Sequence, residues 1–199
     1  AYGYAAVGIN APLADARGRV VLVVDRTMAE PLRKELQRFE SDLAGDGWTV
    51  VRKDVARDAS PAEVKAQIRA VWEADRERTQ AVILLGHIPA VRSGHYNVDG
   101  HGARPMPADT FYGDLDGEWT DADGDGIYDQ NVIPSAVELM VGRVDFANLP
   151  GRYSPVRYPD EVDLVRRYLD KNHAYRQAAV RPARRALIGN AIGDANGQG

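Results

Sequence analysis

Three aspartates at alternating positions are the residues of this sequence with the clearest chemical potential. Asp121, Asp123 and Asp125 lie in an acidic, glycine-rich stretch spanning residues 109–129, and Gly126 follows them directly. This spacing is typical of a tight loop that wraps several hard carboxylate oxygens around one calcium ion, with the glycine permitting the sharp turn. The stretch therefore predicts a calcium-binding loop.

Further oxygens near these aspartates complete the predicted metal site. The backbone carbonyl of Ile127 and the carboxylate of Asp129, directly or through a water, would add to the first three ligands. Asp114 and Asp116 either complete the same site or form a second one. The loop departs from an EF-hand, because its twelfth position is Val132 rather than glutamate and no helical pattern flanks it. We expect a calcium loop of another kind; the alternative is a solvated acidic turn.

Three histidines in one irregular stretch offer a second kind of chemistry. The stretch contains His87, His95, His101 and Asp99. A transition-metal site or an acid–base pair is conceivable there, but the spacing matches no standard ligand motif, and structural or solvent-exposed roles are the simpler interpretation. His87 directly follows a predicted buried strand, so a site could form at that position with two arginines of the same stretch, Arg92 and Arg104.

The serines and the C-terminal arginines form no recognisable site. The serines lack the strand–turn–helix context of a hydrolase nucleophile, and no glycine-rich run precedes a helix as a phosphate loop would. For the arginines we expect a solvated helix face that suits the helix dipole. The residues considered are Ser93, Ser135 and Ser154, and Arg166, Arg167, Arg176, Arg181, Arg184 and Arg185.

The composition excludes several classes of protein. The 199 residues are 44% hydrophobic with a formal net charge of −4, so we expect an ordinary domain with a real core and no nucleic-acid partner. The absence of cysteine excludes a disulfide framework, a thiolate metal site and a cysteine nucleophile within these residues. No apolar run reaches the ~18 residues that span a bilayer, so no membrane span is expected.

Three runs predict the strands that must position these residues. The runs at residues 19–25 and 80–85 are continuously apolar, which is typical of strands covered on both faces, and a second strand is predicted at 48–55. Helical patterns separate the three runs. The resulting β-α-β-α-β order predicts a parallel sheet with right-handed crossovers and helices on both faces.

Capping residues mark where the predicted helices begin. Thr27 and Glu30 form a capping-box pair before a helix that ends near Gly45 or Gly47. The second helix opens with an N-cap, a first-turn proline and a third-position carboxylate at Ser60, Pro61 and Glu63. A third helix opens at Pro159, Asp160 and Glu161 and runs to about Gln177.

A connection of about fifty residues, 86–135, separates the third strand from a predicted fourth strand at 137–144. Such a length is unusual in a compact domain unless the segment has a function or is held together by an internal interaction. We expect calcium bound by the acidic loop to provide that interaction. A fifth strand is predicted at residues 184–189.

Four stretches together resemble a known family. They are AVILLGHIP (81–89), PADTFYGDLDGEWTDADGDGIYD (107–129), ELMVGRVDFANLP (138–150) and PDEVDLVRRYLDKNHAYR (159–176). Their order and content resemble the gingipain-like cysteine peptidases, family C25 of the caspase-like clan. The resemblance covers about residues 19–190 and is strongest over residues 81–176.

The resemblance implies a caspase-like three-layer α/β/α sandwich with a mostly parallel sheet, a structural calcium ion, and a secreted or cell-surface location in a bacterium. It also implies a catalytic His and Cys that lie downstream of the strand matched by residues 184–189. No residue of this chain is therefore expected to be catalytic, including His87, His95, His101 and His173. We expect the fold to be incomplete at its C-terminal end.

Two functions follow from these expectations. In the first, the chain is part of a secreted gingipain-like cysteine endopeptidase, with calcium and its own missing C-terminal half as partners. In the second, it is a non-catalytic, calcium-stabilised caspase-like scaffold or assembly subunit that contacts further copies of itself. A receiver-like or flavodoxin-like binding domain would show the same strand and helix order. In each case residues 1–18 form an arm or linker, and residues 19–199 form the domain, with the calcium-loop insertion at about 86–136.

Overall fold

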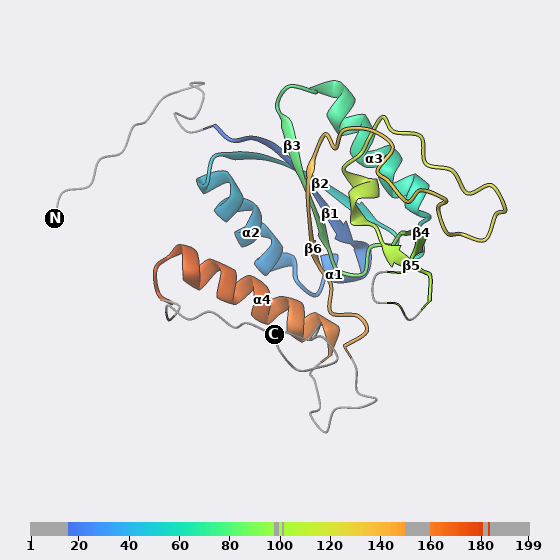
Figure 1. Ribbon diagram of the computed structural model, residues 1–199. Helices are drawn as coiled ribbons and strands as arrows, with labels where there is room; N and C mark the ends of the chain where they lie inside the picture. Colours follow the sequence, from blue (N-terminus) through green and yellow to red (C-terminus); the bar gives the residue numbers. More distant parts are fainter. Residues whose placement is uncertain (1–15, 98–99, 101, 150–159, 181–182, 184–199) are drawn as a thin grey trace.

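A four-stranded parallel sheet forms the centre of the protein. The structure, a computed structural model, describes residues 16–97, 100, 102–149, 160–180 and 183. The strands are β1 (Gly18–Asp25), β2 (Trp48–Val55), β3 (Thr79–Leu85) and β6 (Met140–Val144), in the order β2-β1-β3-β6 (Figure 1). All three strand pairings are parallel, which confirms the predicted sheet.

Helices cover both faces of this sheet, so the fold is an α/β/α sandwich. Helices α2 (Arg33–Gly45) and α4 (Glu161–Arg176) lie on one face, and α3 (Pro61–Ala74) lies on the other, together with the short 3-10 helix η1 (Asp109–Tyr112) (Figure 1). Residues 20–25 of the central strand β1 are all buried, because side chains of both faces pack against helices. This confirms the three-layer architecture predicted from the sequence.

The first helical segment differs from its prediction. A short helix, α1 (Arg26–Ala29), precedes α2, and the N-cap of α1 is Asp25, whose carboxylate accepts a hydrogen bond from the Thr27 backbone N–H. The predicted capping box of Thr27 and Glu30 is therefore wrong. Pro31 contributes to the break because it has no backbone N–H to donate to the preceding turn; Glu30 keeps helical φ and ψ angles, and Leu32 departs from them.

The second predicted helix begins as expected, and the third begins at Glu161 with Asp160 as its N-cap, while Pro159 lies outside the described residues. Ser60 and Glu63 form a reciprocal capping box at the start of α3, with Pro61 at its first position. The Asp160 carboxylate caps α4 by accepting from the Asp163 backbone N–H, and Gln177 ends that helix. Both termini thus follow from local residue chemistry.

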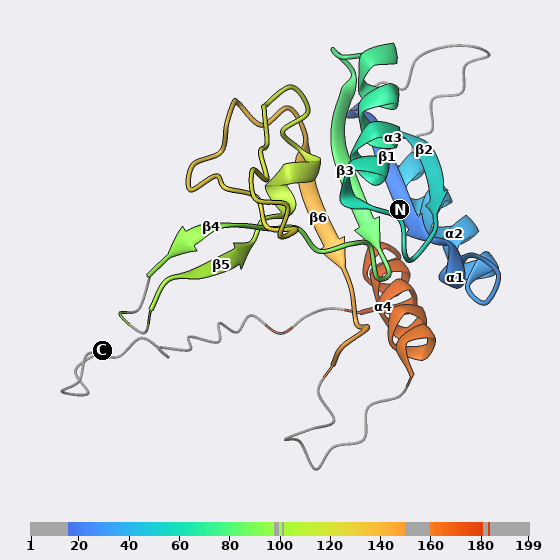
Figure 2. The same cartoon turned by 90° about the vertical axis from the view of Figure 1, so that its right-hand side faces the viewer.

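The long connection between β3 and β6 contains more regular structure than its sequence suggests. Strands β4 (Arg92–Tyr96) and β5 (Arg104–Pro107) form an antiparallel hairpin, and η1 follows. Figure 2 shows the hairpin projecting beyond β6, away from the other strands. The prediction of little strand structure in this segment is therefore wrong.

Strand β6 starts three residues later than the predicted fourth strand. The backbone N–H groups of Glu138 and Leu139 both donate to the carbonyl of Gly113, so residues before Met140 pair with the connection instead of with β3. A Cβ atom at Gly113 would lie 2.6 Å from the Leu139 carbonyl oxygen, and glycine permits this close approach.

Several predictions fall on residues that the structure does not describe. They are the N-terminal arm up to residue 15, the strand at 184–189, and the side chains of Asp99, His101, Ser154, Arg181, Arg184 and Arg185. In the part of the chain that is described, no helix has the length and apolar character needed to cross a membrane.

Candidate metal-binding loop and charged strand edge

The carboxylates of Asp121, Asp123 and Asp125 converge in the loop where the sequence predicts calcium. One oxygen of each lies within 4.8 Å of the others. Backbone N–H groups of the same loop organise them, since Gly124 and Gly126 donate to the two oxygens of Asp121 at 2.9 and 3.0 Å. The loop therefore folds its own backbone around the three carboxylates, which can hold a metal ion.

Little positive charge balances this group. Asp123 and Asp125 are exposed and Asp121 is partly buried, and none of the three forms an ion pair with a described lysine or arginine. Three carboxylates at this separation repel one another unless a cation or a proton neutralises them. No lysine or arginine of the described residues neutralises the group, so it is suited to a cation from solution.

Asp129 is not part of this group in the structure. Its Oδ2 accepts hydrogen bonds from the Thr120 hydroxyl at 2.9 Å and from the Ala122 backbone N–H at 3.1 Å. Asp129 thus closes the base of the loop. The backbone N–H of Ile127 donates to Asp125 at 2.8 Å, so Ile127 contributes to loop geometry whatever its carbonyl binds.

Asp114 and Asp116 form a second group together with Glu138, which the sequence interpretation missed. Their ligand oxygens also lie within 4.8 Å of one another. Asp114 is fully buried and accepts from the Gly117 backbone N–H at 3.0 Å and from the Trp119 indole at 2.9 Å. The two aspartates form a group separate from the alternating aspartates. Its third member, Glu138, comes from the residues that lead into β6.

Polar and charged neighbours already satisfy much of this second group. The Ser135 hydroxyl lies 2.5 Å from Asp114 and 2.9 Å from Asp116, and the Leu115 backbone N–H donates to Glu138 at 2.6 Å. Burial lowers the pKa of the Lys65 ammonium, while the negative charge of Asp114 acts in the opposite direction. A lysine near the carboxylates makes this group less dependent on a bound cation than the alternating aspartates.

The ends of the parallel strands bring a set of charged residues to one edge of the sheet. His87 follows β3 and its Nδ1 lies 3.0 Å from Oδ2 of Asp145, which follows β6. Arg143 on β6 makes two hydrogen bonds to Asp109, each of 2.8 Å. His87 thus pairs with Asp145. The site with Arg92 and Arg104 that its sequence position suggested is not formed among the described residues.

Asp25 is the buried centre of this edge and was missed as a functional candidate. Its carboxylate is fully buried at the end of β1 and accepts from Arg57 at 2.7 Å and from the His87 backbone N–H at 3.2 Å. Arg57 also binds Glu161 at 2.9 Å. An aspartate that directly ends a buried parallel strand was the sequence signal for this position, because such strand ends meet at one edge.

The arginines of α4 do more than line a solvated face. Arg166 lies 3.4 Å from Glu35, and Arg176 pairs with Asp46, so both contact the α2 segment. His173 adds a contact of 2.9 Å to Asp42 of α2. Arg167 is exposed as predicted. Ser93 and Ser135 donate to oxygen acceptors and have no described basic partner of the kind that activates a nucleophile.

Comparison of the chain with models of protein families, with curated proteins and with solved structures gives no match. The site therefore has to be interpreted from its own geometry. What that geometry provides is two groups of carboxylates able to hold a metal ion, and a strand edge whose charges are paired with each other.

Proposed function

We propose that this chain is the calcium-stabilised, non-catalytic half of a gingipain-like cysteine endopeptidase. The observation that carries the calcium assignment is the convergence of Asp121, Asp123 and Asp125 within 4.8 Å, without an ion-pair partner among the described lysines and arginines. Bound calcium would remove the repulsion within the loop and hold the connection between β3 and β6 in place.

Calcium fits the donor set better than other common metals. Both acidic groups contain only carboxylate oxygens, which suit hard cations, whereas zinc and copper prefer histidine or thiolate ligands. Magnesium demands strict octahedral geometry and is usually held by one or two carboxylates with several waters. An exposed loop with three carboxylates suits the larger and more irregular coordination of calcium.

The peptidase assignment is supported by where the four resembling stretches lie in the fold. The stretch ending GHIP covers β3 and its end, and the acidic stretch covers η1, the three alternating aspartates, Asp114 and Asp116. The stretch containing VGR covers β6, and the last one covers α4. Each stretch thus coincides with an element that builds the parallel sheet, its cover or its longest connection.

The catalytic dyad has to come from other polypeptide. The chain contains no cysteine, and the resemblance places the family's catalytic His downstream of residues 184–189. We therefore assign this chain the sheet and the calcium loop, and assign the nucleophile and its base to a partner segment.

Calorimetric titration of metal-free protein with calcium tests the metal assignment. We expect saturable binding that is lost in the variant with Asp121→Asn, Asp123→Asn and Asp125→Asn, because neutral amides remove the charge that attracts the ion. Asp58→Asn is the matched control, since Asp58 is an exposed carboxylate outside both groups. Equal calcium binding by the triple variant and the control would reject this loop as the site.

A cleavage assay tests the peptidase assignment. The chain, joined to or mixed with the polypeptide that supplies the dyad, should cleave a peptide substrate in a thiol-dependent reaction that iodoacetamide blocks. If the natural protein that contains this chain folds and binds calcium but shows no such cleavage, the peptidase assignment is contradicted and the calcium assignment stands.

The second candidate is a non-catalytic, calcium-stabilised scaffold. It is favoured by the paired strand edge, where Asp25, Arg57 and Glu161 satisfy one another and offer no free reactive group. A natural protein with neither a cysteine nor a peptidase activity would support the scaffold function. A cysteine required for cleavage would exclude it.

A further inference from the structure

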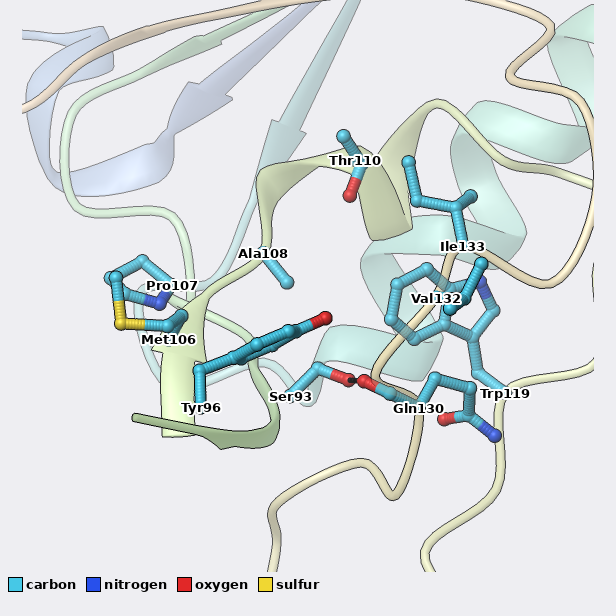
Figure 3. Close-up of a pocket in the computed structure, with 10 residues that line it drawn as sticks. All are labelled: Ser93, Tyr96, Met106, Pro107, Ala108, Thr110, Trp119, Gln130, Val132 and Ile133. Atoms are coloured by element: carbon cyan, nitrogen blue, oxygen red, sulfur yellow. Dashed lines mark hydrogen bonds between the residues drawn. The ribbon is translucent and has the colours of Figure 1, made fainter. Parts of the chain in front are cut away.

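A cavity of about 310 Å³ lies between the β4–β5 hairpin and the acidic loop. Figure 3 shows its walls, with Tyr96 and Met106 from the hairpin on one side and Trp119 from the acidic loop on the other. Val132 and Ile133, which follow the acidic loop, complete the apolar lining. The volume is at the lower end of the range found for ligand sites, and fits one large side chain.

The apolar rim of this cavity is unusually open to solvent. Val132 is 80% exposed, and Ile133 and Met106 are each 41% exposed. Single exposed apolar residues are common on protein surfaces, but three around one concavity form a surface that a partner can cover. The rim therefore favours an apolar ligand.

Four polar groups in the walls are already hydrogen-bonded within the protein, while the buried Oε1 of Gln130 has no hydrogen-bond partner among the described residues. A sugar or nucleotide would require these groups to exchange existing partners, and unmatched polar groups of such a ligand would lose their hydration without compensation. An apolar side chain requires no such exchange. The bonds are Tyr96 hydroxyl to the Asn131 carbonyl, Trp119 indole to Asp114, Ser93 hydroxyl to the Gln130 carbonyl, and Gln130 amide to the Thr120 hydroxyl.

The charge around the cavity determines which residues are favoured next to a bound apolar side chain in a ligand peptide. Glu118 directly precedes Trp119, and Asp129 directly precedes Gln130, so carboxylates adjoin two residues of the lining. The acidic loop also contributes Asp116 and the alternating aspartates, whereas the described cations nearby are Arg92 and Arg104 of the hairpin strands and Lys65, whose Nζ lies 5.7 Å from the centre of the Trp119 ring. Negative charge dominates even after one calcium ion binds, so cationic neighbours are favoured.

The hairpin is poorly suited to extend its sheet with a bound strand. Pro105 and Pro107 occupy two of the four positions of β5 and have no backbone N–H to donate. A ligand peptide would therefore be held by a side chain in the cavity and not by a continuous ladder of backbone hydrogen bonds.

We infer that this cavity binds an aromatic or long aliphatic side chain of a peptide segment that carries lysine or arginine next to it. The cavity walls recognise the apolar group, and the acidic loop attracts its cationic neighbours. This docking site is independent of the proposed peptidase activity, because it requires neither the catalytic dyad nor cleavage.

Titration of the calcium-saturated protein with blocked tripeptides tests the inference. The probes are acetyl-Lys-Phe-Lys-amide, acetyl-Glu-Phe-Glu-amide and acetyl-Lys-Ser-Lys-amide, followed by NMR through the indole N–H of Trp119. We expect the first probe to bind at least about tenfold more tightly than either of the others, and its affinity to fall as salt is added. Equal binding of the Phe and Ser probes would overturn the inference, because the acidic loop alone would then explain the attraction. No shift with the first probe at millimolar concentration would overturn it as well.

A matched pair of variants locates the binding. Val132→Lys removes apolar surface from the rim and adds a cation, so affinity for acetyl-Lys-Phe-Lys-amide should fall at least about tenfold. Val180→Lys makes the same change at an exposed valine outside the cavity and should leave the affinity unchanged. An equal loss in both variants, with both folded by circular dichroism, would place the binding elsewhere.

Discussion

Nδ1 of His87 lies 3.0 Å from Oδ2 of Asp145, although 58 positions separate the two residues in sequence. The contact joins the ends of β3 and β6, where the Gly86 backbone N–H also donates to the Val144 carbonyl at 2.9 Å. Both sides of the long connection are therefore fastened at one point. The acidic loop and the hairpin both belong to the connection that these contacts close.

A double-mutant cycle measures what this contact contributes. His87→Ala, Asp145→Ala and the double variant should give a coupling energy of about 1 kcal/mol in chemical unfolding, because the pair is partly exposed and water competes with it. The same cycle with His95→Ala and Asp145→Ala should give no coupling, since His95 lies on the exposed hairpin. Coupling of equal size in both cycles would contradict the assigned contact.

Asp25→Ala should lower the free energy of unfolding by roughly 2–4 kcal/mol. The substitution removes a fully buried carboxylate and leaves the backbone N–H groups of Thr27 and His87 without their acceptor. Asp54→Ala removes an exposed carboxylate from the same edge and should cost less than about 1 kcal/mol. Urea denaturation of both variants checks the difference, and similar losses would argue against a central role for Asp25.

Gly86→Ala should destabilise the protein by more than about 2 kcal/mol. Gly86 has a φ of +85°, and a Cβ atom there would lie 2.6 Å from the Cβ atom of Asp25. The backbone strain of an alanine at positive φ and its steric overlap with Asp25 therefore both destabilise the variant. Gly142→Ala is the control, because a Cβ atom at this β6 position meets nothing within 4 Å. Thermal unfolding of the two variants should separate them clearly; a stable Gly86→Ala protein would show that this turn can relax.

Tyr112 should make the protein less stable above pH 10. Burial raises the pKa of its hydroxyl above the ordinary value of about 10, and the group donates to the Pro89 carbonyl at 2.7 Å. The folded chain keeps this proton where the unfolded chain loses it, so the contribution is complete below pH 10 and declines above it by up to about 1.4 kcal/mol per pH unit.

Comparison with Tyr112→Phe isolates this effect. The variant should be less stable by about 1 kcal/mol at pH 8, because the hydrogen bond to Pro89 is lost, and should lose less stability between pH 10 and 11. Burial lowers the pKa of Lys65, which acts in the opposite direction in this range but is common to both proteins. Parallel pH profiles for the two proteins would show that Tyr112 is not the titrating group.

Removal of calcium should lower the melting temperature. An ion present at 100 times its dissociation constant stabilises the folded state by about 2.7 kcal/mol, or roughly 5–10 °C for a chain of this size. The chelator should have no such effect on the variant with Asp121→Asn, Asp123→Asn and Asp125→Asn. An unchanged melting curve of the unaltered protein with excess chelator would remove the calcium proposal.

Local chemistry was sufficient to predict most of the regular elements. The sequence pattern identified β1, β2 and β3 to within one residue, and Ser60, Pro61 and Glu63 located the start of α3. These predictions succeed because propensity, periodicity and capping depend on neighbours in sequence. The break at Pro31 also follows from local residue chemistry, but the sequence interpretation gave more weight to the capping pair of Thr27 and Glu30.

The alternating aspartates were also predictable, since three carboxylates two positions apart in a glycine-rich turn converge through local geometry alone. Glu138 was not, because it lies beside Asp114 and Asp116 through a tertiary contact, in which the backbone N–H groups of Glu138 and Leu139 donate to the Gly113 carbonyl. The β4–β5 hairpin was missed for a related reason: its short strands contain Gly94, Pro105 and Pro107 and lack a clear alternation.

The sequence by itself determined the class of fold, the alternation of β1, α2, β2, α3 and β3, and the acidic loop, all of which depend on short-range patterns. Only the tertiary structure decided that Asp25, Arg57, His87 and Asp145 share one edge, and that Trp119 faces Tyr96 across a cavity. Those neighbours come from different strands and loops. Their meeting depends on strand order and on the packing of the long connection, which no local pattern of residues encodes.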